Sequence, residues 1–201
     1  HLPSVPMWQL HLPVVILQLH VGKKLDTHPN IFKLHLYEVM AEYSNFSFIY
    51  VDGSKIDRNV ACAAVFKSQV LQCRLPEGSS IFTAELRAIL IALNFVKESQ
   101  LDRCLILSDS LSALQAIKSC KFDHPLVQQI LENCHNLHIN GQIVSFCWIP
   151  SHIGIPGNER ADAAARYALN FQVTEFLIPS SDLNQRLMNI LGNCGKVNGQ
   201  V

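Results

Sequence analysis

Four acidic residues stand where apolar segments of the sequence end or where helical patterns begin. Asp52 and Asp109 each follow a short apolar run, while Glu85 and Asp162 lie near the starts of two longer segments. In an open sheet, ligands gather outside the carboxyl ends of neighbouring strands. If the two runs form neighbouring strands, Asp52 and Asp109 meet at one edge of the sheet and offer their carboxylates to a ligand.

Each of these acids also has a purely structural interpretation. An aspartate after a strand is common in turns, because its side chain bonds the local backbone. An acid in the first turns of a helix interacts favourably with the positive end of the helix dipole. Position alone therefore leaves both interpretations open, and the surrounding sequence has to decide between them.

The elements that must position these acids begin with a block of three strands. Phe46–Val51 is an aromatic and β-branched run that predicts a buried strand, and we expect the sequence Asp52-Gly53-Ser54 to stop it with a turn. Val60–Phe66 and Val70–Leu75 lie on either side of Lys67-Ser68-Gln69, which suits a hairpin.

The hydrophobic period then changes to that of helices alternating with strands. Thr83–Glu98 carries apolar residues at three- and four-residue intervals, which is typical of a helix packed on a sheet. The remaining predicted elements are a strand at Cys104–Leu107, helices at Leu111–Ser119 and Pro125–Leu137, a strand at Gln142–Ile149 and a helix at Gly157–Leu169. We expect an α/β domain at residues 46–170, with a mixed five-stranded sheet (a three-strand antiparallel meander plus two parallel strands) and helices on both faces.

Weaker patterns flank this region. Residues 1–45 begin with His1 and hold one helix-like patch near Lys33–Tyr43, so we interpret them as a connector or the remnant of an upstream domain in a longer polypeptide. Pro13–Leu17 is apolar but far shorter than the ~20 residues that a membrane span needs, and no signal peptide is evident. Residues 171–201 are expected to be a C-terminal extension, with one candidate short helix at Asp182–Leu191.

Composition limits the classes of protein. The chain has 16 basic and 16 acidic residues, whereas a protein that binds nucleic acid through its own electrostatics usually has a basic surplus. The balance counts against tight independent binding but leaves room for a local basic face or a partner domain. The seven cysteines form no CxxC pair, so we expect reduced thiols and an intracellular location.

Four segments of the chain, in order, resemble the type 1 ribonuclease H domain, above all the version fused to reverse transcriptases of non-LTR retrotransposons. They are V-D-G-S around Asp52, T-A-E-L around Glu85, L-S-D-S around Asp109, and W-I-P-S-H-I-G-I-P-G-N-E-R-A-D from Trp148 to Asp162. The last segment is highly specific, and the resemblance covers about Phe46 to Tyr167. Val51 departs from the threonine of many relatives, and the long basic insertion of some cellular members is missing.

The resemblance implies two Mg²⁺ ions, or Mn²⁺, held by Asp52, Glu85, Asp109 and Asp162. The implied chemistry agrees with the residue types, because magnesium prefers carboxylate, water and phosphate oxygens. Two ions ~3.5–4 Å apart stabilise the attacking and leaving oxygens of an in-line displacement. Four converging carboxylates would otherwise repel one another and raise one another's pKa.

The resemblance also implies an endonuclease that hydrolyses the RNA strand of RNA–DNA hybrids and leaves 5′-phosphate and 3′-hydroxyl ends. His152 matches a histidine that assists proton transfer or product departure, and histidine exchanges protons near neutral pH. Candidate substrate contacts are Gly53, Ser54, Ser110 and Asn158.

The expected partners are an RNA–DNA hybrid and an upstream reverse transcriptase domain of the same polypeptide. The alternatives are a catalytically silent ribonuclease H-like spacer or nucleic-acid-binding module, an integrase or resolvase of the wider superfamily, and a transposon remnant that folds poorly. A superfamily enzyme acting on DNA would need its own acid spacing and would lack the S-H-I-G-I-P-G-N segment.

Overall fold

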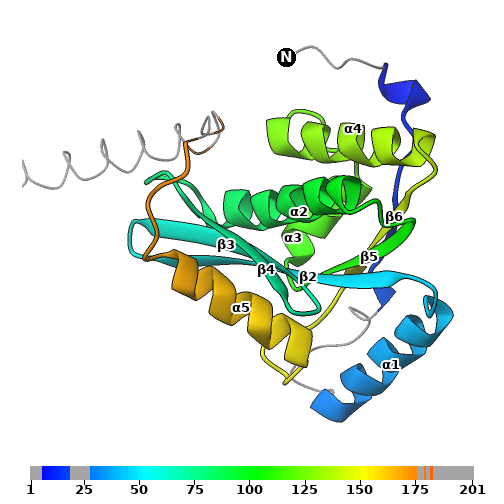
Figure 1. Cartoon of the computed structure of the whole chain (residues 1–201), viewed down its shortest axis with the longest axis horizontal. Coiled ribbons are helices and arrows are strands. Elements are labelled where there is room, and N and C mark those ends of the chain that lie inside the picture. Colours follow the sequence, from blue (N-terminus) through cyan, green and yellow to red (C-terminus); the bar gives the residue numbers. More distant parts are fainter. Residues whose placement is uncertain (1–5, 19–27, 176–178, 180–181, 183–201) are drawn as a thin grey trace, which may run out of the picture.

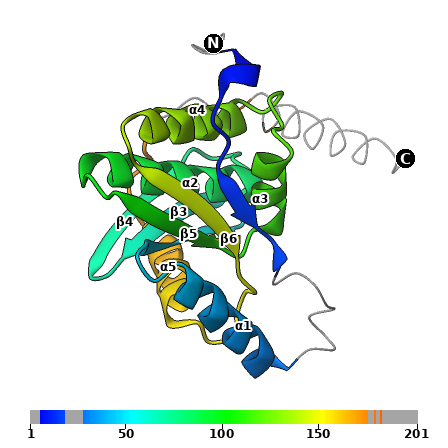
Figure 2. The ribbon, with the colours of Figure 1, turned by 90° about the vertical axis from the view of Figure 1, so that its right-hand side faces the viewer.

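A six-stranded mixed sheet forms the centre of the molecule, in the strand order β1-β6-β5-β2-β3-β4. The computed structural model describes residues 6–18, 28–175, 179 and 182. Helices cover both faces of the sheet, as Figures 1 and 2 show. The predicted fold class, an α/β mixed sheet with helices on both faces, is confirmed.

The antiparallel half of the sheet is the predicted meander of β2 (Ser47–Ile56), β3 (Asn59–Phe66) and β4 (Gln69–Leu75). The prediction that Asp52-Gly53-Ser54 stops the first strand is wrong. These three residues stay extended and pair with Ala61–Ala63 of β3, and the chain turns later, where Asp57 has φ 53°. Cross-strand pairing and tertiary packing therefore override the local preference of Asp and Gly for a turn.

The parallel half consists of β5 (Arg103–Ser108), β6 (Ile143–Trp148) and a short strand, β1 (Val14–Ile16). β5 pairs with β2 and is buried along almost its whole length, as expected of a strand covered on both faces. The five predicted strands are present, and β1 adds a sixth from the segment that the sequence assigned to a connector. It is preceded by a 3-10 turn at Met7–Gln9.

Three helices, α2 (Ile81–Glu98), α3 (Leu111–Lys118) and α4 (Pro125–Ile139), form the layer on one side of the sheet (Figure 1). On the other side lies α5 (Pro156–Ala168), with α1 (Pro29–Glu42) beside it (Figure 2). The predicted apolar stripe of α2 is buried against the sheet and α4. Burying each such aliphatic side chain contributes about 1.5–3 kcal/mol, so the stripe fixes the position of this helix.

The flanking regions contribute structure of their own. The helix-like patch near Lys33–Tyr43 coincides with the greater part of α1, which ends at Glu42 and whose Leu36 and Val39 join the core. The helix expected at Asp182–Leu191 lies outside the described residues, apart from Asp182. Among the helices that the structure describes, none combines the length and the apolar composition that crossing a membrane requires.

Candidate functional site

The site lies between the central strands β2 and β5, at the point where their parallel pairing ends. The two strands run parallel, and Val51 lies opposite Ser108, so Asp52 and Asp109 are the next residues on each chain. β5 ends there while β2 continues to Ile56. The condition under which the sequence would bring these two aspartates together, that their strands are neighbours, is therefore met.

Gly53 allows the third acid to reach this site. A Cβ at position 53 would lie 2.9 Å from the Cβ of Ala84 and 3.0 Å from the backbone nitrogen of Glu85. Only a residue without a side chain lets α2 pack this closely on β2. The Gly53 backbone N–H also hydrogen-bonds to the carboxylates of Asp52 and Glu85.

The N-terminus of α2 is held by Ser80, which directly precedes the helix, and by Asp182 from the C-terminal segment. Ser80 caps the helix by accepting a hydrogen bond from the Thr83 backbone N–H at 3.0 Å. The carboxylate of Asp182 accepts hydrogen bonds from the Ser80 backbone N–H at 2.8 Å and from the Thr83 hydroxyl at 2.6 Å. An anionic side chain at a helix N-terminus satisfies backbone donors and opposes the helix dipole, so Asp182 fixes the turn that carries Glu85.

Asp52, Glu85 and Asp109 form a compact acidic cluster, with one carboxylate oxygen of each lying within 4.8 Å of the others. Asp52 is 6% exposed and Glu85 7%. Oε2 of Glu85 is buried and, within the described part of the chain, has no hydrogen-bond partner. A buried oxygen without a donor, inside a set of hard oxygen ligands, fits a divalent cation such as Mg²⁺.

Burial and mutual repulsion make these acids difficult to ionise. Burial first, and then the charges of Asp109 and Asp162, raise the pKa of Asp52 to about 8. Burial and the neighbouring carboxylates of Asp52 and Asp109 raise the pKa of Glu85 well above its usual range. Burial also raises the pKa of Asp109, against a hydrogen bond from Asn158. A bound cation removes this penalty, because it favours the charged form of every carboxylate around it.

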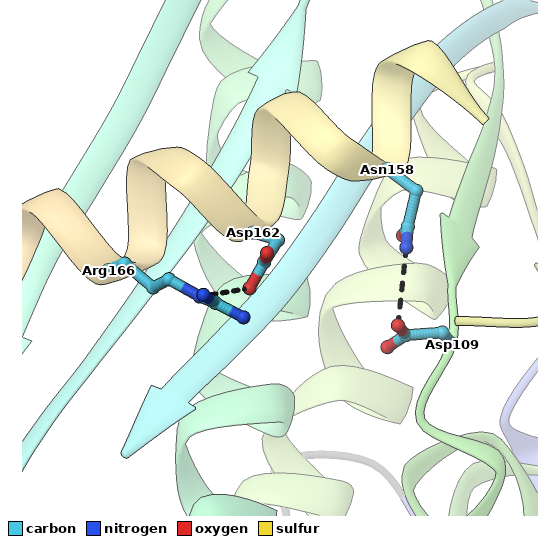
Figure 3. Close-up of polar contacts among 4 residues, drawn as sticks. All are labelled: Asp109, Asn158, Asp162 and Arg166. Carbon is cyan, nitrogen blue, oxygen red and sulfur yellow. Dashed lines mark hydrogen bonds and ion pairs between the residues drawn. The ribbon is translucent and has the colours of Figure 1, made fainter. Parts of the chain in front are cut away.

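The fourth predicted acid, Asp162, faces the same site from α5 but lies outside the cluster of three. Its charge contributes to the raised pKa of Asp52, yet its Oδ1 accepts an ion-paired hydrogen bond at 2.8 Å from Arg166 one turn later (Figure 3). Asp162 instead groups with His152 and Glu159, whose ligand atoms lie within 4.8 Å of one another. The structure therefore brings together three of the four predicted acids, and the metal-ligand roles of all four stay predictions.

Asn158, one of the four candidate substrate contacts, lies against Asp109. It is buried, and its side-chain amide donates a hydrogen bond to Oδ2 of Asp109 at 3.2 Å (Figure 3). The Trp148 indole N–H donates to the backbone carbonyl of Asp109 at 3.1 Å. These two bonds hold the loop after β5, so Asn158 acts on the orientation of an acid in this structure.

The other candidate residues have mixed surroundings. Ser54 is buried on β2, and Ser110 caps α3 by accepting a hydrogen bond from the Ala113 backbone N–H. His152 is exposed on the loop before α5, has φ 56°, and its charge lowers the pKa of Asp109. Their contacts with substrate stay predictions.

One contact that shapes the site was missed by sequence reasoning. A Cβ at Gly157 would overlap the ring of Tyr50, so the first turn of α5 rests directly on this ring. Strand alternation places Tyr50 on the same face of β2 as Asp52, which is the signal that the sequence offered. Gly157 thereby allows α5 to pack close to β2, which in turn places Asn158 and Asp162.

Comparison with known families agrees with this geometry. The family model described as RNase H matches residues 45–170, well over half of the chain. The match contains β2 to β6, α2 to α5 and all the acids of the site, and it leaves β1, α1 and the segment around Asp182 outside. On the strength of this match, the chain belongs to the RNase H family.

Proposed function

We propose that this domain is a metal-dependent endonuclease that hydrolyses the RNA strand of RNA–DNA hybrids and leaves 5′-phosphate and 3′-hydroxyl ends. The observation that carries the proposal is the convergence of Asp52 on β2, Glu85 on α2 and Asp109 just after β5, at the point where the parallel pairing of β2 with β5 ends. Buried acids that repel one another destabilise a fold when they are ionised, and a bound cation removes this cost. Membership of the RNase H family makes the hybrid the favoured substrate.

In this proposal the acids bind metal, neighbouring groups orient the acids, and His152 exchanges protons. Asp52, Glu85 and Asp109, joined by Asp162, would hold two Mg²⁺ or Mn²⁺ ions, which when bound stabilise charge on the attacking and leaving oxygens. Asn158 orients Asp109, and the Gly53 backbone N–H orients Glu85. His152, which is exposed on the loop before α5, would exchange a proton with solvent or product.

RNA is distinguished from DNA by its 2′-hydroxyls and by the shape of the hybrid rather than by sequence. The candidate contacts for this recognition are Gly53, Ser54, Ser110 and Asn158. Ser110 and Asn158 hydrogen-bond within the chain, whereas Gly53 and Ser54 lie on the part of β2 that extends beyond the end of β5.

We further propose that the domain works beside an upstream reverse transcriptase domain, in a retrotransposon polyprotein inside the cell. The balanced charge of 16 basic and 16 acidic residues supports a partner that supplies affinity for the phosphate backbone. On its own, the chain should bind hybrids with a Kd typical of non-specific complexes, roughly 10⁻⁴ to 10⁻⁶ M at physiological salt.

The test is cleavage of end-labelled RNA–DNA hybrid, DNA duplex and RNA duplex of one sequence, with Mg²⁺ and with EDTA. The RNA strand of the hybrid should be cut only with metal, and Asp109→Asn should reduce the rate by at least about 10²-fold. Asp102→Asn is the matched control, because Asp102 is exposed and lies just before the opposite end of β5. Equal cutting of the three substrates would refute the choice of substrate.

One observation favours a second candidate, a catalytically silent module that binds nucleic acid. Asp162 is ion-paired with Arg166 instead of joining the other acids. In that case the unaltered chain would bind the hybrid without cutting it at any Mg²⁺ or Mn²⁺ concentration. Arg166→Ala, which frees Asp162, would then leave cleavage absent, whereas in an active enzyme it alters the metal concentration needed for half-maximal rate.

A further inference from the structure

Two cysteines face each other across the edge hairpin of the sheet. Cys62 on β3 pairs directly with Cys73 on β4, and their sulfur atoms lie 3.5 Å apart. Both thiols are free. Directly opposed residues of an antiparallel pair have the Cβ separation nearest to that of a disulfide, so a small shift of the two side chains brings the sulfurs to the bonding distance of about 2.05 Å.

The two thiols have unequal surroundings. Cys62 is fully buried, whereas Cys73 is only partly covered. A hydrogen bond from Cys62, the positive charge of Arg87 and a hydrogen bond from Thr174 stabilise the Cys73 thiolate against its burial, and lower its pKa to about 7. The same hydrogen bond, together with burial, raises the pKa of Cys62. An accessible thiolate beside a buried thiol is the arrangement of an attacking and a resolving cysteine.

We propose that Cys62 and Cys73 form a reversible redox site that closes a cross-strand disulfide in response to a two-electron oxidant of the peroxide class. The Cys73 thiolate attacks one peroxide oxygen, the O–O bond breaks, and a sulfenic acid and hydroxide result. Cys62 sulfur then attacks the Cys73 sulfur, and the S–O bond breaks as the S–S bond forms. The thiol proton of Cys62 and the departing hydroxide leave as water, so two thiols and one hydrogen peroxide give one disulfide and two waters.

The site is independent of the proposed nuclease activity, yet it adjoins the same elements. Cys62 pairs with Cys73 on one side and with Gly53 of β2 on the other, so the three residues form one row across the sheet. Thr174 follows α5 and donates its backbone N–H to the carbonyl of Arg74 at 2.9 Å. The disulfide would tie the edge strand β4 into the row that contains Gly53.

Peptide mapping of the full chain tests this directly, because trypsin cuts between the two cysteines. The reduced, desalted chain is treated with hydrogen peroxide at pH 7, its remaining thiols are alkylated, and it is digested. Fragments 59–67 and 68–74 should appear as one linked species, two hydrogens lighter than their sum and separated again by dithiothreitol. Cys73 should lose its thiol about tenfold faster than the half-buried Cys120, whose pKa is raised by burial.

Variants assign the partners. Cys73→Ser should abolish the linked species, whereas Cys120→Ser should leave its yield unchanged. Oxidation of Cys73 to sulfinic acid without linkage would overturn the proposal, and so would linkage of Cys73 to other cysteines as often as to Cys62. The unaltered chain gives the deciding map by itself, so a variant that fails to fold does not remove the test.

Discussion

Asp52, Glu85 and Asp109 are buried beside one another in the folded chain but are separately hydrated in the unfolded chain. The folded chain therefore keeps protons on these acids at pH values where the unfolded chain has released them. Because the folded chain binds more protons than the unfolded chain between the two pKa values, the free energy of unfolding is highest below the unfolded pKa and falls as pH rises toward the folded pKa.

We therefore expect the metal-free protein to lose stability as pH rises from about 4 to about 8, the values between which the pKa of Asp52 moves. The rise in the pKa of Asp52 alone, about four pKa units, corresponds to a loss on the order of 5 kcal/mol. Chemical denaturation in EDTA at several pH values measures it, and Mg²⁺ should restore more stability at pH 8 than at pH 5. Asp52→Asn should flatten the pH dependence and Asp102→Asn should not; a profile already flat in the unaltered chain would contradict the raised pKa values.

The contact between Gly157 and the Tyr50 ring leads to a second prediction. Gly157→Ala should lower stability by about 1–3 kcal/mol and slow hybrid cleavage, because α5 must rise to make room for the added methyl group. Thermal unfolding and initial cleavage rates measure the two effects. In a Tyr50→Ala background the same substitution should cost little, which a double-mutant cycle reports as coupling. Additive effects would show that the ring does not set the position of α5.

At this scale, residue identity was easier to predict than residue geometry. The acids were recognisable because their contexts repeat a family pattern, and neighbouring parallel strands then placed Asp52 beside Asp109. The ion pair of Asp162 with Arg166 and the bond from Asn158 to Asp109 depend on how α5 docks. That docking includes the contact of Gly157 with the Tyr50 ring. Strand alternation indicates the face of β2 on which Tyr50 lies, but not which residue of α5 packs against it.

Among the elements, α2 is the one whose position matters most for the site, and its N-terminus is held by Asp182. We expect Asp182→Ala to destabilise the fold by about 1 kcal/mol, since it removes two hydrogen bonds and an anion from this end of the helix. Denaturant unfolding measures the change. Glu175→Ala is the control, because Glu175 is an exposed acid of the same C-terminal segment. Equal effects of the two substitutions would argue against capping.

Element type followed from hydrophobic period wherever a segment was long enough to show one. The α2 stripe and the buried β5 strand were predicted almost to their ends. β1 was not, because three residues with one partner strand carry too little pattern to stand out from irregular chain. The end of β2 was misplaced because Asp, Gly and Ser favour turns locally, while β3 offers them a complete ladder.

At the scale of the whole molecule, the short strand β1 forms one edge of the sheet by pairing with β6. A chain lacking residues 1–18 should be about 1–3 kcal/mol less stable, because it loses this ladder and the contacts of Val15 and Ile16 with the core. It should also associate more at high concentration, since an uncovered strand pairs with other chains. Denaturant unfolding and light scattering measure the two effects. Unchanged stability would mean that the pairing of β1 with β6 contributes nothing to the free energy of unfolding.

The contacts of Val173 and Thr174 with Arg74, and of Asp182 with Ser80, lie beyond the last residue of the family match. A recombination event that carried only the matched segment into a new host gene would transplant the acids while leaving behind their supports at β4 and at the start of α2. The segment that supports the site is accordingly longer than the family match, and a transferred domain would need residues 171–182 or equivalent contacts from its new neighbours.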